Sequence, residues 1–166
     1  AQLCAGDILQ IVGANGSGKT TLLNLLNTSL NPSAGELRWR SKAVANGAGA
    51  YRASMLYLGH LAGVKISLTP TENLRWFGSL HATRAACSVS SALRRVGLAD
   101  LQDEPCHRLS AGQVRRVALA RLWLAAASVW LLDEPMTAID NAGVGELEAL
   151  FADHRADGGV VLFTSH

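Results

Sequence analysis

This chain of 166 residues has few cysteines, a small net charge and no long hydrophobic run. Its three cysteines, Cys4, Cys87 and Cys106, form no Cys-x-x-Cys pair, which argues against a disulfide framework or a structural zinc site. The net charge is only +2, too weak a field to indicate a nucleic-acid partner. The longest apolar run, residues 122–132, contains Ser128 and is shorter than the roughly 20 residues that span a bilayer.

The chain does have the apolar content of a folded domain. Hydrophobic residues make up 49% and charged residues 17%, whereas an average soluble domain has about 25% charged residues. This composition excludes a disordered, solvating chain. The length suits one domain with a sizeable core rather than two.

Short apolar runs separated by helical patterns predict an α/β core. Strands are expected at Ile8–Val12, Met55–Leu58, Val129–Leu132 and 160–164. The first is followed by a Gly-rich turn and a helical pattern over Lys19–Leu26, which together open an α/β unit. Residues 37–39 favour another short strand, and 41–50, rich in Ala, Gly and Asn, favour a loop.

A helical insertion is expected to interrupt this core between about residues 65 and 127. Thr69 begins a capping box with proline in the first helical position, which predicts a helix to about Leu80. Two more helices are expected over 87–96 and 110–124. A further helix, over 144–154, lies outside the insertion.

The segment between the first strand and the first helix matches the phosphate-binding pattern G-x-x-x-x-G-K-[ST]. Its residues are Gly13, Ala14, Asn15, Gly16, Ser17, Gly18, Lys19 and Thr20, and Thr21 follows. Glycines allow a tight turn whose N–H groups point at phosphates, and the positive helix end adds to the attraction. Lys19 is expected to reach the β- and γ-phosphates, and the Thr20 hydroxyl to coordinate Mg²⁺. The motif predicts a nucleotide site but leaves GTPases, kinases, helicases and transport ATPases open.

Two carboxylates follow the strand Val129–Leu132, namely Asp133 and Glu134. At the carboxyl edge of a parallel sheet such side chains project into the ligand crevice. Asp133 is suited to hold Mg²⁺. Glu134 is suited to orient or deprotonate an attacking water. A plain exit from strand to loop has the same appearance, and only the phosphate loop upstream favours the functional interpretation.

A third motif consists of Leu109, Ser110, Ala111, Gly112 and Gln113. Ser110 and Gln113 alone would form a capping box, which can begin any helix. The order of the motifs along the chain is more specific than this segment alone. It runs from the phosphate loop to this segment, then to the Asp-Glu strand end, Ala138-Ile139-Asp140 and His166. In this order the whole chain resembles the ATP-binding domain of ABC transporters. The resemblance implies a P-loop NTPase fold, α/β with a mostly parallel sheet and a helical subdomain.

The resemblance also implies roles for these residues. Leu109–Gln113 is similar to the family's signature motif, which closes on the nucleotide of a second, head-to-tail copy. Glu134 is implied as the catalytic base, His166 as the switch histidine at the γ-phosphate, and Asp140 as part of the loop joining the two sites. His60 takes the position where the family has a glutamine, which puts the usual coupling in doubt.

His60, Ala111 and the arginine-rich helix after Gln113 resemble one branch of the family, the ATP-binding subunit of the cytochrome c maturation (haem exporter) system. The resemblance implies ATP and Mg²⁺ as cofactors. It implies an integral-membrane subunit as partner and a peripheral place on the cytoplasmic face of the inner membrane. No nucleic acid is expected. The alternatives are a soluble ABC-type ATPase acting on nucleic acid or ribosome, an ABC transporter of another substrate, and a small-molecule kinase.

One ABC-type domain is expected over residues 1–166, with a core of about 1–64 and 128–166 and a helical subdomain of about 65–127. The resemblance implies that this domain is cut at both ends. Only twelve residues precede Gly13, and none is aromatic. The residue that stacks on adenine in the family is therefore expected outside this sequence.

Overall fold

The computed structural model describes residues 2–44, 48–137 and 139–165, which form two compact units. Unit 1 comprises Ala1–Gly59, Ala127–Pro135 and His154–His166. Unit 2 comprises His60–Ala126 and Met136–Asp153. Residues 136–153, which the sequence placed with the α/β core, thus group with the helices of unit 2.

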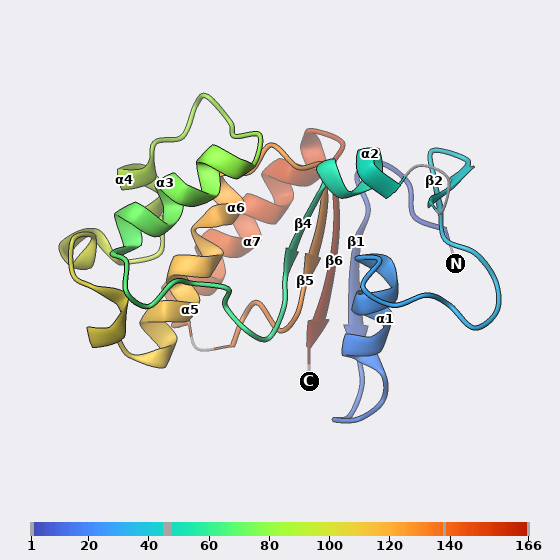
Figure 1. The fold of residues 1–166 in the computed structure, drawn as a ribbon, viewed down its shortest axis with the longest axis horizontal. Coiled ribbons are helices and arrows are strands. Elements are labelled where there is room, and N and C mark those ends of the chain that lie inside the picture. The colour runs from blue at the N-terminus through green and yellow to red at the C-terminus, as the bar shows by residue number, and fades with distance from the viewer. Residues whose placement is uncertain (1, 45–47, 138, 166) are drawn as a thin grey trace. The chain divides into compact units, whose positions relative to one another are not determined.

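Unit 1 is built on a parallel four-stranded sheet in the order β1-β6-β5-β4 (Figure 1). Its strands are β1 (Ile8–Val12), β4 (Met55–Leu58), β5 (Val129–Leu132) and β6 (Val160–Ser165). Each pair is parallel and in continuous register, from Ile8 opposite Val161 to Val12 opposite Ser165 in the first pair. The α/β class with a parallel sheet, predicted from the apolar runs, is confirmed.

Helix α1 (Lys19–Leu26) packs on one face of this sheet. Leu23 is fully buried and contacts Leu131 and Leu162, which lie on the same face of neighbouring strands. Strands buried on both faces need continuous apolar runs, and β5 and β6 have them. Burial of these leucines stabilises the layer by about 1.5–3 kcal/mol per side chain.

The opposite face of the sheet carries a buried aromatic stack. The rings of Trp130 and His154 lie 3.7 Å apart between centroids, at 5° to one another. His154 belongs to the last turn of α7 (Asn141–Ala156) and is 2% exposed. Gly159 follows that helix end, and a Cβ at this position would overlap the His154 ring at its Nε2, Cε1 and Cδ2 atoms. Only a residue without a side chain fits beside the stacked imidazole.

Gly159→Ala is therefore expected to destabilise unit 1 by about 1–3 kcal/mol, since overpacked side chains must leave their rotamers. In thermal unfolding this is a fall in Tm of about 2–4 °C per kcal/mol. Gly145→Ala is the matched control, because a Cβ on Gly145, in the same helix α7, meets nothing within 4 Å. That variant should melt at the wild-type temperature or slightly above it. Equal melting of both variants would contradict the close packing at Gly159.

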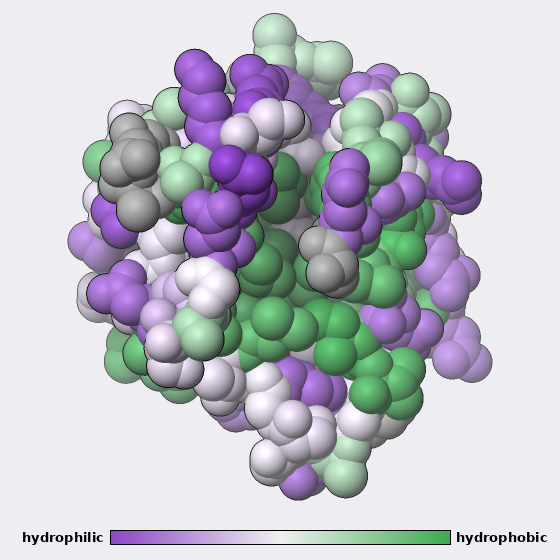
Figure 2. Space-filling view, turned by 90° about the vertical axis from the view of Figure 1, so that its right-hand side faces the viewer, coloured by the Kyte–Doolittle hydropathy of each residue, from purple (hydrophilic) through white to green (hydrophobic). Residues whose placement is uncertain are grey.

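Strand β1 lies at the edge of the sheet and keeps much of its apolar surface exposed. Among the described residues it pairs only with β6, and Ile8, Leu9 and Val12 are 39%, 38% and 66% exposed. Figure 2 shows hydrophobic side chains gathered on the face that carries β1 and α1. The sequence predicted a core strand here, whereas the edge position leaves its side chains half open to solvent.

The segment 41–50, predicted as a loop, is partly regular. It contributes β3 (Lys42–Ala43), which pairs antiparallel with β2 (Arg38–Trp39), and the start of α2 (Ala48–Ala53). The loop prediction was wrong here because a tertiary contact stabilises α2. Tyr51 is 5% exposed and its hydroxyl donates to the Leu26 carbonyl at 2.8 Å.

Unit 2 is a cluster of short helices. These are α3 (Pro70–Leu80), α4 (Val89–Arg95), the 3₁₀ turns η2 (Ala99–Leu101) and η3 (Cys106–Arg108), α5 (Ala111–Leu119), α6 (Arg121–Leu124) and most of α7. The capping box at Thr69 is confirmed, because Thr69 Oγ1 accepts from the Glu72 N–H and the Glu72 carboxylate accepts from the Thr69 N–H. The helix predicted over 110–124 is instead divided at Ala120. There the Trp123 N–H bonds the Ala120 carbonyl only three residues back, a tighter turn than an α-helix.

Two buried polar side chains tie loops to this cluster. Asn73, fully buried, accepts from the Lys65 N–H and donates to the Lys65 carbonyl. The Arg121 guanidinium donates to the carbonyls of Ala62 and Gly63 at 3.1 and 2.7 Å. Burial lowers the pKa of Arg121, and the two carbonyls offset part of the cost of desolvating its charge. The loop 60–69 is thereby fixed against α3 and α6.

None of the helices in the described part of the chain is both long and apolar enough to cross a membrane.

Candidate functional site

The predicted phosphate loop lies between the end of β1 and the start of α1, as the motif requires. Gly16 and Gly18 have φ values of +80° and +93°, a region that glycine enters without steric cost. Gly18 is the N-cap of α1, and no side chain caps that helix. The first N–H groups of α1 therefore stay available to an anion, which the helix dipole also attracts.

Lys19, the first residue of α1, folds back over this loop. Its ammonium donates to the carbonyls of Gly13 and Ala14, the second at 3.3 Å. The side chain is only 9% exposed. The positive charge is thus held beside the loop N–H groups, where a phosphate would meet both.

The carboxyl ends of the four strands meet at the edge of the sheet next to this loop. Val12 is opposite Ser165 across β1 and β6, and Leu58 is opposite Leu132 across β4 and β5. Asp133 continues β5 by one residue, and its N–H donates to the Leu58 carbonyl at 2.8 Å. Ligands of parallel sheets bind at this edge, and the acidic strand end and the phosphate loop both lie there.

Asp133 joins the phosphate-loop helix to β6. Its Oδ2 accepts from the Thr20 hydroxyl at 3.2 Å, and its Oδ1 accepts from the Thr164 hydroxyl at 2.7 Å. Asp133 is 5% exposed and Thr164 is 1% exposed. A hydroxyl and a carboxylate oxygen side by side form the hard oxygen donor set that Mg²⁺ prefers. The residues present therefore fit Mg²⁺.

Glu134 stands one residue beyond, in an unusual backbone conformation. Its φ is +50°, a left-handed region that costs an L-residue roughly 1–2 kcal/mol. Its N–H donates to the Thr164 hydroxyl at 2.9 Å. The chain therefore turns sharply after Asp133.

In unit 2 the segment Leu109–Gln113 forms the beginning of α5. Ser110 is the N-cap, and its Oγ accepts from the Gln113 N–H at 3.2 Å. The Gln113 side chain accepts in return from the Ser110 N–H at 2.8 Å. The capping box is confirmed, and Ser110 and Ala111 lie exposed at a helix N-terminus.

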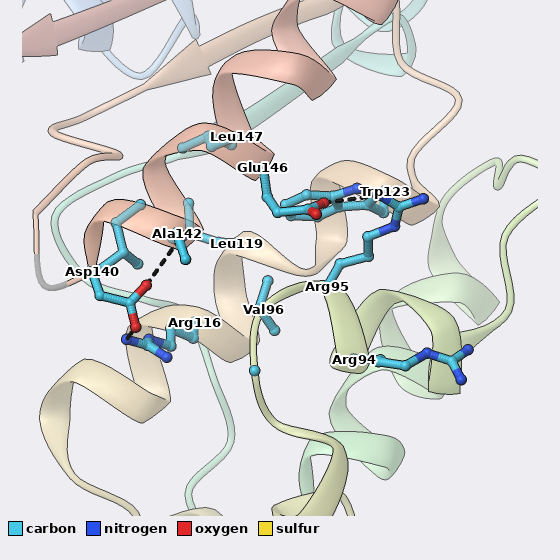
Figure 3. A pocket seen from close by; sticks show the side chains of 13 residues that line it. Arg94, Arg95, Val96, Arg116, Leu119, Trp123, Asp140, Ala142, Glu146 and Leu147 are labelled. Atoms are coloured by element: carbon cyan, nitrogen blue, oxygen red, sulfur yellow. Dashed lines mark hydrogen bonds and ion pairs between the residues drawn. The ribbon is translucent and has the colours of Figure 1, made fainter.

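Asp140 caps the start of α7 and pairs with α5. Its Oδ1 accepts from the Gly143 N–H at 2.8 Å, and its Oδ2 lies 3.3 Å from the Arg116 guanidinium (Figure 3). The Gly143 hydrogen bond and, next, the Arg116 charge lower the pKa of Asp140. Asp140 is therefore ionised at neutral pH and ties the start of α7 to α5.

A cavity of about 190 Å³ lies beside this pair, lined by residues of α4, α5, α6 and α7. Figure 3 shows a second ion pair at its wall, between Arg95 and Glu146 at 2.9 Å. Leu119, Trp123 and Leu147 supply apolar lining. Two of the arginines that line the cavity are paired to carboxylates. We therefore interpret the cavity as a gap in the packing between helices of unit 2.

Two other predicted site residues, His60 and His166, and the motif residue Ala138 remain. His60 follows β4 by two residues and is exposed, so its imidazole is open to solvent. Ala138 and His166 lie outside the described residues. The role of His166 stays a prediction.

Sequence reasoning missed Thr164 and Arg116. Thr164 counted only as the end of an apolar strand, although it is the one hydroxyl among the predicted strand residues 160–164. A polar side chain at the carboxyl end of a buried strand is a signal that could have found it. Arg116 had no comparable signal, because its pairing with Asp140 depends on how α5 and α7 pack.

Comparison with known families decides between the classes that share a phosphate loop. A model described as ABC transporter matches residues 1–137. The chain belongs to the ABC transporter family. It is an ATP-binding protein and an ATP hydrolase of that family, as the motif order predicted.

Curated relatives show which branch of the ABC family this chain resembles. The chain is 50% identical over 165 residues to "Cytochrome c biogenesis ATP-binding export protein CcmA" of Pseudomonas putida, covering 99% of this chain and 79% of that protein. It is 47% identical over 164 residues to the protein of the same name from Yersinia pestis, covering 99% and 75%. The resemblance to the cytochrome c maturation branch is confirmed.

Solved structures show the same ABC fold. The putative ABC transporter ATP-binding protein from Pyrococcus furiosus matches with a TM-score of 0.81 at 27% identity, covering 98% of this chain and 80% of that one.

Proposed function

We propose that this chain is the ATP-hydrolysing subunit of a membrane export complex that serves cytochrome c biogenesis. The observation that carries the proposal is the meeting of Lys19, Thr20, Asp133 and Glu134 at one edge of the sheet in unit 1. The identity of 50% to the export protein of Pseudomonas putida supports the biological role.

In this proposal the loop of residues 13–21 binds the phosphates of ATP through its N–H groups and Lys19. Thr20 and Asp133 would hold Mg²⁺, which would neutralise the charge that develops on the phosphate oxygens. Glu134 orients the attacking water and takes up its proton. His166 contacts the γ-phosphate.

The second part of the proposal is a head-to-tail dimer. The exposed start of α5, with Ser110 and the Gly112 N–H at a positive helix end, is suited to an anion. We infer that it closes on the γ-phosphate bound by the partner copy. Asp140, held by Arg116 in unit 2, then belongs to the loop between the two sites.

The third part is a membrane subunit as partner, with this chain peripheral on the cytoplasmic face of the inner membrane. Unit 2 carries exposed apolar side chains around α3, with Ile66, Trp76 and Leu80 at 62%, 40% and 60% exposure. The Lys65 ammonium lies 4.2 Å from the Trp76 ring centroid, which places this loop against the helix. Such a surface is suited to docking on another protein.

Ser110→Arg tests the dimer and the export role together. The bulky charge at the start of α5 should abolish ATP turnover and cytochrome c maturation when the full-length chain complements a strain lacking its own subunit. ATP binding to the separate chain should stay within about threefold, because the phosphate loop is untouched.

Ser88→Arg is the matched control, because Ser88 caps α4 through the Ser91 N–H at 3.1 Å in the same way. Both variants lose a cap worth about 1 kcal/mol, and only Ser110→Arg should lose turnover. Full turnover in Ser110→Arg would contradict the dimeric mechanism. Turnover by wild type without cytochrome c maturation would contradict the export role alone.

A further inference from the structure

One buried hydroxyl contacts the backbone or side chain of both acidic residues at the strand end. We propose that Thr164 is a positioning residue for hydrolysis, which acts by fixing the Asp133 carboxylate and the turn that aims Glu134. The inference rests on the proposed roles of these two residues. It concerns a residue of β6 that lies outside every motif of the sequence.

The two hydrogen bonds of the Thr164 hydroxyl fix its orientation. Its proton is donated to Asp133 Oδ1 at 2.7 Å, and its oxygen accepts the Glu134 N–H at 2.9 Å. The residue is 1% exposed, so water does not compete for either bond. Hydrogen bonds to a buried carboxylate are among the stronger ones.

For Asp133 the consequence is orientation. Thr164 occupies Oδ1, while Oδ2 faces the Thr20 hydroxyl at 3.2 Å. Rotation of the carboxylate would break one bond or the other. Thr164 therefore selects which oxygen is turned toward the phosphate-loop helix.

For Glu134 the consequence is direction. The residue sits at φ +50°, where an L-residue is strained and needs local compensation. The bond from its N–H to Thr164 supplies part of that compensation inside unit 1. Without this bond the backbone at Glu134 can relax to a more common φ. The Glu134 Cβ, and with it the carboxylate, would then shift.

The test compares Thr164→Val, which keeps the shape and removes the hydroxyl, with Thr164→Ser, which keeps the hydroxyl. In steady-state ATP hydrolysis by the full-length chain, Thr164→Val should lower kcat about 10- to 100-fold, the range for losing a hydrogen bond to a charged group. The KM for ATP should change less than about twofold, since Lys19 and its loop are untouched. Thr164→Ser should recover most of the rate.

Hydrogen exchange supplies a readout independent of turnover. The Glu134 amide should exchange at least about tenfold faster in Thr164→Val than in wild type or Thr164→Ser, because its acceptor is gone. Thr71→Val is the control, since the buried Thr71 hydroxyl has no hydrogen-bond partner among the described residues. It should keep wild-type kcat and exchange.

A double-mutant cycle shows whether Thr164 acts through Glu134. In a Glu134→Gln background, Thr164→Val should lower the residual rate less than it does in the wild-type background, because only the effect through Asp133 remains. Equal losses in both backgrounds would overturn the role through Glu134, and an unchanged kcat in Thr164→Val or failure of Thr164→Ser to recover the rate would overturn the inference. A wild-type chain without ATPase activity would instead overturn the proposed function on which the inference rests.

Discussion

Glu134→Gln should reduce ATP turnover by about 10²- to 10⁴-fold, the usual contribution of a general base. The substitution keeps the size of the side chain and the bond from the residue 134 N–H to Thr164. It removes only the charge that can accept a proton from water. Phosphate release under saturating ATP measures the loss, and the melting temperature should stay at the wild-type value.

The same variant should accumulate the state that precedes hydrolysis. If the copies close head to tail on ATP, Glu134→Gln should elute as a dimer with ATP retained, whereas wild type should return to monomer as ATP is consumed. Size-exclusion chromatography with labelled ATP separates the two outcomes. The dimer should form with wild-type ATP affinity, because the phosphate loop is unchanged.

Glu36→Gln is the control for Glu134→Gln. Glu36 also lies in unit 1, but its side chain is 57% exposed and pairs with the exposed Arg38 at 3.2 Å. Surface pairs of this kind contribute about 0–1 kcal/mol, so both turnover and dimerisation should be normal. Rapid hydrolysis by Glu134→Gln would remove Glu134 as the base.

The fold and the placement of the motifs could be predicted where one local rule decided the structure. The phosphate loop, the Thr69 and Ser110 capping boxes and the apolar strands follow from residue type and spacing alone. These rules predicted the strand before Lys19, the helix that begins with it, and the strand that ends at Asp133. Their convergence at one sheet edge also follows, because parallel strands present their carboxyl ends together.

The failures share a different cause, namely contacts between residues far apart in the chain. Helix α2 depends on Tyr51, whose hydroxyl reaches the Leu26 carbonyl. The left-handed turn at Glu134 depends on Thr164, 30 residues later. The exposure of β1 depends on its place at the edge of the sheet. No pattern of local residue type carries these facts.

Lys19→Ala should abolish measurable ATP binding, because of the position of the Lys19 ammonium. In unit 1 that charge is nearly buried and bonds the carbonyls of Gly13 and Ala14. Its removal takes away the cation beside the uncapped N-terminus of α1. An ATP carrying several negative charges would then meet only neutral N–H groups.

Calorimetry should show a fall in ATP affinity of at least about 100-fold for Lys19→Ala, the loss of a charge-assisted contact of nearly 3 kcal/mol. Lys42→Ala, at an exposed position of β3, should bind as wild type does. Lysine at position 19 also holds the loop through Gly13 and Ala14, so thermal unfolding without nucleotide must accompany the titration. If Lys19→Ala melts near the wild-type temperature and still binds ATP with unchanged affinity, residues 13–21 are not the phosphate-binding loop. The ATPase site proposed around Lys19 would then be wrong as well.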